Sequence, residues 1–226
     1  MADTQNFDKL NILKRRSLPY DKYFGDMELS DKQRARRKDL ALILEDILAI
    51  YFDYMTTGLG LGVLNEVLAK QELTYSLYDA LDGKDYFRDG ELDKYITNFV
   101  NDTYTATVDN MKNHPNDYDY TGETPYWVSD DRAQFMAENE ANTIINSAEN
   151  IEAIKSGKTH KIWMAFPDDR VRPTHVDVNG AKIPIDSYFD VGGARMLYPK
   201  DLTSELSTAS SFPEEYINCR CVAVYV

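Results

Sequence analysis

The chain has 226 residues, 43% of them apolar, which is enough for one large or two small domains with a sizeable core. Its formal net charge of −13 argues against a protein whose whole surface coats nucleic acid, because such a surface needs clustered Lys and Arg. No apolar stretch approaches the ~20 residues of a membrane span and no signal peptide is evident, so we expect a soluble protein without a membrane partner.

The N-terminal region is basic although the chain is acidic. Residues 1–38 hold ten Lys or Arg against six Asp or Glu. We predict an N-terminal arm over residues 1–29, and the alternative is a frayed terminus with incidental charge. Cations near a helix N-terminus oppose the helix dipole, so their presence here favours a contact with nucleic acid or another partner. The alternative is that this run of charge is a solvated helix face, which is the more common case. The candidate DNA-binding residues are Lys14, Arg15, Arg16, Arg34, Arg36, Arg37 and Lys38.

Helical periodicity then extends over the next part of the chain. Ser30 and Gln33 form a capping box that opens a long helix, whose predicted core stripe is Leu40, Leu44, Ile47, Leu48, Tyr51 and Met55. Gly58, Gly60 and Gly62 predict a turn before a second helix, from about residue 61 to 81. A third helix is predicted over 91–113 and a fourth from 130 to about 154. The fourth should bury Ala133, Ala137, Ala141, Ile144, Ala148 and Ile151.

The character of the sequence changes after Gly157. Residues 162–166, 182–185 and 217–226 are short runs rich in aromatic and β-branched residues, as strands are. A strand over 217–226 would place Cys219 and Cys221 on the same face. Because helices come first and strands later, the sequence predicts an α+β protein with a helical domain (30–156) and a small α+β domain with a short-stranded sheet (157–226).

An ordered set of residues marks this C-terminal part: Trp163, Asp169, Arg170, Arg172, His175, Asn179, Gly180, Pro199 and the run Ile217, Asn218, Cys219, Arg220, Cys221. Together with a helix carrying Glu138 to Asn142, this set resembles the C-terminal domain of the phage Mu F-like minor head (head morphogenesis) proteins of tailed phages. The resemblance implies that these are scaffold residues: Trp163, Asp169, Arg170, Arg172, His175, Gly180, Asn218, Cys219, Arg220 and Cys221.

The resemblance also implies a function. It implies a non-enzymatic virion protein in the capsid interior near the portal, which is present in the host cytoplasm during assembly. The implied partners are the portal protein, capsid and scaffold proteins, and phage DNA. The implied role is support of head assembly and genome ejection, and no cofactor is expected.

His175, Cys219 and Cys221 admit a chemical interpretation as well. Two thiols and an imidazole are zinc ligands, with a fourth from Asp169, Asp177 or water. Because there are three obvious ligands and no Cys-x-x-Cys pair, we predict instead that both cysteines are buried core residues and that no metal is bound.

The alternative function is a nucleic-acid hydrolase centred on His175, either metal-free and ribonuclease-like or zinc-dependent. Arg170 and Arg172 would then stabilise a phosphate transition state. Buried ion pairs between Asp168 or Asp169 and these arginines or Arg220 would equally serve to fix a long loop. No nucleophile, base and oxyanion donors occur in a recognisable order. Glu138 and Glu140 face apart on their helix, and we predict that they are surface residues or inter-domain contacts.

Overall fold

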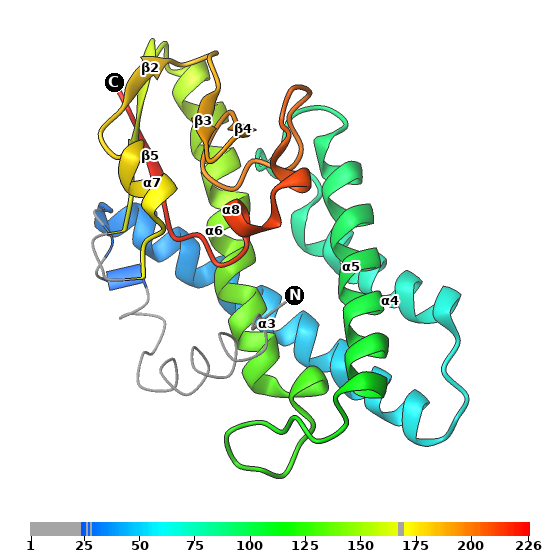
Figure 1. Ribbon diagram of the computed structural model, residues 1–226. Helices are drawn as coiled ribbons and strands as arrows, with labels where there is room; N and C mark the ends of the chain where they lie inside the picture. The colour runs from blue at the N-terminus through cyan, green and yellow to red at the C-terminus, as the bar shows by residue number, and fades with distance from the viewer. Residues whose placement is uncertain (1–23, 26, 28, 167–169) are drawn as a thin grey trace. The chain divides into compact units, whose positions relative to one another are not determined.

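The computed structural model describes residues 24, 25, 27, 29–166 and 170–226 (Figure 1). Most of the predicted arm, with Lys14, Arg15 and Arg16, lies outside these residues. The chain divides into two compact units. The helical unit comprises residues 24–25, 31–80 and 96–138, and the strand-containing unit comprises residues 27, 29–30, 81–95, 139–166 and 170–226. This division places residues of the fourth helix in both units, whereas the predicted boundary at residue 156 follows that helix and stays a prediction.

Helix α3 (Asp31–Gly60) is the longest element of the helical unit. It begins directly after Ser30, as the capping box predicts. Its buried face contains five of the six residues of the predicted stripe, and Ile47 is half-buried. Ala41 and Phe52 complete that face because they lie at helical spacing from the same stripe.

Helix α4 (Glu66–Leu81) begins later than predicted. The predicted start near Leu61 is wrong because residues 61–65 form the connection from α3. Gly62 has a positive φ of 65°, and the Val63 amide donates to the Gly58 carbonyl at 3.0 Å. The Asn65 side chain then caps the helix, since its Oδ1 accepts from the Leu68 amide at 3.2 Å.

Helices α5 (Glu91–Asn113) and α6 (Asp130–Lys155) match the predicted third and fourth helices, and the 3-10 turn η1 (Tyr126–Val128) precedes α6. Within the helical unit α5 buries Ile96, Val100, Thr103 and Thr107, while Phe99, Tyr104, Val108 and Met111 are half-buried. All six residues predicted to face inward from α6 are buried. Small side chains on that face allow neighbouring backbone to approach closely.

The strand-containing unit holds a three-stranded antiparallel sheet of order β2-β1-β5. Its strands are β1 (His160–Met164), β2 (Lys182–Pro184) and β5 (Val222–Tyr225). In the register Ile162 faces Lys182 on one side of β1 and Val224 on the other. The central strand β1 is therefore hydrogen-bonded along both edges.

A separate hairpin, β3 (Phe189–Val191) and β4 (Ala194–Met196), turns at Gly192 and Gly193. The short helices α7 (Pro173–Asp177), η2 (Ala209–Ser211) and α8 (Pro213–Tyr216) complete this unit. Its buried cluster consists of Trp163, Phe189, Val191, Ala194, Met196, Ala209, Cys219 and Cys221. Helices and antiparallel strands segregate along the chain, so the predicted α+β class is confirmed.

The predicted strand over 217–226 is wrong in its first half. Asn218 adopts a left-handed conformation with φ of 58°, which interrupts an extended chain, and pairing with β1 begins at Val222.

None of the helices in the described part of the chain combines the length and apolar composition required to cross a membrane.

Candidate functional site

Helix α7 positions His175. Pro173 occupies the first turn of this helix, where its fixed φ suits a helix start and no amide hydrogen is needed. The His175 amide donates to the Arg172 carbonyl at 3.0 Å, and the side chain is 1% exposed. Its ring meets the indole of Trp163 edge to face, with centroids 5.6 Å apart and an interplanar angle of 88°. The central strand thus holds the imidazole against the core.

The chain after α8 positions the two thiols. The Cys219 amide donates to the Tyr216 carbonyl at 3.1 Å, directly after the left-handed Asn218. The Cys221 carbonyl accepts from two side-chain amides of α6, Asn142 at 3.3 Å and Asn146 at 3.1 Å. Both cysteines are 2% exposed. The turn and the helix amides, rather than strand alternation, orient the thiols.

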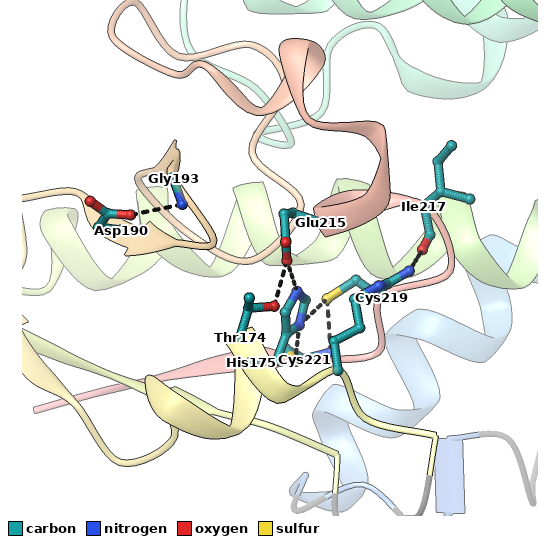
Figure 2. A network of polar contacts seen from close by, with 9 residues as sticks. Thr174, His175, Asp190, Gly193, Glu215, Ile217, Cys219 and Cys221 are labelled. Atoms are coloured by element: carbon teal, nitrogen blue, oxygen red, sulfur yellow. Dashed lines mark hydrogen bonds and ion pairs between the residues drawn. The ribbon is translucent and has the colours of Figure 1, made fainter. Parts of the chain in front are cut away.

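These elements bring three side chains together (Figure 2). Nδ1 of His175 lies 3.2 Å from Sγ of Cys221 and 3.6 Å from Sγ of Cys219. The three atoms lie within 4.8 Å of one another, and all three residues are buried. An imidazole and two thiols are the ligand types that zinc prefers.

Glu215 of α8 contacts the other side of the imidazole (Figure 2). Its Oε2 lies 3.1 Å from Nε2 of His175 and accepts a hydrogen bond from the Thr174 hydroxyl at 2.8 Å. The carboxylate packs so closely on the hairpin turn that a Cβ at Gly192 would lie 2.2 Å from Oε1. Gly192 also has a φ of 60°, so only glycine fits this turn beside Glu215.

The pKa values of the three grouped residues move in opposite directions. Burial alone would lower the pKa of His175, but the hydrogen bond and charge of Cys219 raise it. Burial alone would raise the pKa of Cys219, but hydrogen bonds from Cys221 and His175 and the imidazolium charge lower it well below its ordinary value. The hydrogen bond to Cys219, with burial, raises the pKa of Cys221. Of the two thiols, Cys219 therefore loses its proton more readily than Cys221.

The remaining residues of the predicted set bond to backbone groups, form turns or pack at the edge of the core. The Arg172 guanidinium donates to the Ile217 carbonyl. The guanidinium carbon of Arg220 lies over the Phe166 ring, 3.7 Å from its centroid. Gly180 has a φ of 78° and donates its amide to the Trp163 carbonyl at 2.8 Å. Asn218 forms the left-handed turn, and Arg170 is half-buried. Asp168 and Asp169, and with them the predicted ion pairs, lie outside the described residues.

The basic residues of α3 differ in their environment. Arg37 is fully buried, so the prediction that it contacts DNA is wrong in this conformation. Arg34 is half-buried and donates to the carbonyls of Phe24 at 3.1 Å and Gly25 at 2.8 Å. Arg36 and Lys38 are also half-buried. The basic run therefore contributes partly to structure.

Sequence reasoning missed Thr174 and Glu215. Glu138 is buried, which excludes the surface alternative of its prediction, while Glu140 is half-buried and accepts from the Tyr95 hydroxyl at 2.8 Å. Glu215 follows Pro213 in the first turn of a short helix, a position where an acidic residue is usually explained by the helix dipole. The one available signal was the Gly192-Gly193 pair, which indicates a hairpin turn and close approach of another group.

The comparisons with known proteins identify a family for most of the C-terminal half of the chain. The family model described as Phage Mu protein F like protein matches residues 99–224, which include every described member of the site. No curated protein and no solved structure matches the chain.

Proposed function

Because the chain belongs to the Phage Mu protein F like family of phage head proteins, we propose that it is a minor capsid protein of the head interior. In this proposal it joins the assembling head beside the portal, contacts the packaged DNA, and supports assembly and genome ejection. The observation that carries the proposal is the family match over residues 99–224.

The burial of the motif supports a scaffold role for the strand-containing unit. Trp163, His175, Cys219 and Cys221 are each at most 2% exposed. Side chains at this depth contact one another rather than a polymeric substrate. They fix α7 and the segment after α8 against the central strand β1.

The same burial weakens the hydrolase alternative. A general base must reach the proton that it abstracts, directly or through one water molecule. His175 is 1% exposed, and its ring nitrogens already face Cys221 and Glu215. A phosphodiester therefore has no direct access to this imidazole in the described conformation.

Helix α3 supports a protein partner for the helical unit. Ile43, Ile50 and Tyr54 are exposed by 41%, 72% and 37%, and their spacing places them on one side of the helix. Exposed apolar side chains that cluster in this way favour protein contacts. We assign this surface, Ile43-Ile50-Tyr54, to the portal or capsid contact of the proposal.

Mass spectrometry of purified virions tests the placement in the particle. We expect peptides of this chain in intact virions at low copy number, together with portal peptides after mild disruption. Failure to find it in purified virions, while it accumulates in the infected cell, would refute the virion assignment.

Co-purification with the portal protein tests the assigned surface. Ile50→Glu should weaken the association because it places a charge in an apolar contact, whereas Asp53→Ala, an exposed change on the same helix, should not. Equal recovery of portal protein with both variants would remove the contact from this face of α3.

Binding to double-stranded DNA tests the basic run. Replacing Lys32, Arg36 and Lys38 by Gln should weaken binding and reduce its salt dependence by about one released counterion per lost phosphate contact. Replacing Lys155 and Lys158 by Gln provides the control, because these lysines lie far along the sequence from the basic run. The same salt slope in both variants would remove α3 from the DNA-binding surface.

A further inference from the structure

We propose that His175, Cys219 and Cys221 bind a structural zinc ion. Of the described residues that carry metal-ligand atoms, these three form a group whose atoms lie within 4.8 Å of one another, and all three are buried. The sequence favoured core cysteines without metal, because it offers three obvious ligands and no Cys-x-x-Cys pair. The geometry points to a metal site instead.

The separations of the ligand atoms fit a tetrahedral ion. With Zn–S of about 2.3 Å and Zn–N of about 2.0 Å, neighbouring sulfur and nitrogen ligands lie about 3.5 Å apart. Nδ1 of His175 lies 3.2 Å from Sγ of Cys221 and 3.6 Å from Sγ of Cys219. Both nitrogen–sulfur distances are therefore within about 0.3 Å of that value. The two sulfur atoms lie within 4.8 Å of each other, and about 3.8 Å separates two sulfur ligands of a tetrahedral zinc ion.

The surroundings of His175 match those of a metal-bound imidazole. Nε2 lies 3.1 Å from Oε2 of Glu215, and in the neutral tautomer that donates this hydrogen bond the Nδ1 lone pair faces the thiols. A carboxylate on the far nitrogen is the usual partner of a zinc-bound histidine, and it orients the ring. The Thr174 hydroxyl donates to the same Glu215 oxygen at 2.8 Å and holds the carboxylate in place.

Charge balance favours a divalent ion in this buried place. Two thiolates neutralise Zn²⁺, so the complex with neutral His175 carries no net charge and is cheaper to bury than separate ions. The cluster supplies three ligands, and a fourth donor such as water completes the tetrahedron. Soft thiolates disfavour Mg²⁺ and Ca²⁺ as occupants.

Metal analysis of the full-length protein tests this directly. After purification without chelator and dialysis against metal-free buffer, we expect about one zinc per chain by elemental mass spectrometry, since thiolate–imidazole sites bind tightly. Replacing zinc by Co²⁺ should give a thiolate-to-cobalt charge-transfer band and the visible absorption of a tetrahedral site. The cobalt spectrum identifies sulfur ligation without any substitution, so it does not depend on a variant that folds.

Two outcomes would overturn the proposal. One is protein that stays free of zinc and cobalt after incubation with either ion, with the same melting temperature in chelator; this would leave a metal-free hydrogen-bonded core. The other is a Cys219–Cys221 disulfide in the freshly purified protein, detected by peptide mass. Stoichiometric zinc without a charge-transfer band on cobalt exchange would likewise exclude the two thiolates.

A matched pair of substitutions tests the positioning role of Glu215. Glu215→Ala removes the acceptor from His175 Nε2 and should weaken zinc affinity about 10–100-fold. Glu214→Ala changes the adjacent, exposed carboxylate and should leave the affinity unchanged. Competition with a chromogenic chelator measures both, and Glu215→Gln, which keeps an acceptor oxygen, should recover part of the affinity. Equal affinities for the Glu215→Ala and Glu214→Ala proteins would exclude Glu215 as a positioning residue.

Discussion

From Leu40 to Met55, α3 buries only hydrophobic side chains, whereas the strand-containing unit buries Asn146, Lys200 and Asp201. Each of these three polar groups has a defined partner: the Pro199 carbonyl, the Asn139 carbonyl and the Ser204 amide. An apolar side chain tolerates any apolar neighbour of suitable volume, but a buried polar group requires a particular atom. This stretch of α3 should therefore tolerate conservative core changes that the polar core of the strand-containing unit does not.

Asp201 is the sharpest test of that difference. Its fully buried carboxylate accepts from the amides of Leu197 at 2.8 Å, Thr203 at 3.2 Å and Ser204 at 3.0 Å, and from the Ser204 hydroxyl. Asp201→Ala should destabilise the protein by about 3–5 kcal/mol because it strands several buried donors. Chemical denaturation measures the loss. Asp190→Ala, which removes an exposed carboxylate bonded to the Gly193 amide, should cost under ~1 kcal/mol; a similar cost for both would contradict the comparison.

Leu44 tests the helical unit. It is 1% exposed, so Leu44→Ala should cost about 2–4 kcal/mol through lost burial and the cavity left behind. Leu44→Met, which nearly conserves volume, should cost under ~1.5 kcal/mol. The exposed Ile50→Ala should change the unfolding free energy by less than ~0.5 kcal/mol. If Leu44→Met destabilised the protein as much as Leu44→Ala, this core would not tolerate a change of side-chain shape at nearly constant volume.

Asn146 and Asn142 provide a graded test within the strand-containing unit. Asn146 donates to the carbonyls of Pro199 and Cys221, both at 3.1 Å, whereas Asn142 donates to the Cys221 carbonyl at 3.3 Å. Asn146→Ala should cost about 2 kcal/mol, since the Pro199 carbonyl then loses this donor. Asn142→Ala should cost less because Asn146 still serves Cys221. The reverse order in thermal or chemical denaturation would show that the shared carbonyl does not decide these costs.

Lys161 predicts a pH dependence for the strand-containing unit. It is fully buried on β1 and donates to the Ile185 carbonyl at 2.8 Å. Burial lowers its pKa from 10.5 to about 7, although the charges of Asp201 and Asp186 partly oppose this. Between these values the unfolded chain binds more protons than the folded chain, so stability should rise with pH across that window and level off below it.

The slope from Lys161 is at most about 1.4 kcal/mol per pH unit. Denaturation midpoints from pH 7 to pH 9 measure it, with Lys161→Met as the control that removes the titrating group. A slope that persists unchanged in Lys161→Met would assign the pH dependence to another residue.

The same contrast explains how much the sequence predicts. The period of α3 and α6 identifies Leu44 and Ala141 as core residues because one apolar face suffices for that inference. The first half of the predicted closing strand fails at Asn218, whose left-handed turn leaves no mark on a pattern of alternating residues. Likewise His175, Cys219 and Cys221 stand out by residue type, but Glu215 does not. Its role depends on contacts with Thr174 and the Gly192 turn, which are distant in sequence.

Because β1 is the central strand, its two edges are paired at different times during synthesis of the chain. Its partner β2 follows it closely in the chain, but the register with β5 requires residues 222–225. During synthesis on the ribosome, one edge of β1 therefore keeps its N–H and C=O groups unpaired until those residues emerge. An open edge of this kind can pair with a strand of another nascent chain. The interval between translation of β1 and of β5 is thus the stage at which the strand-containing unit is most exposed to misassembly.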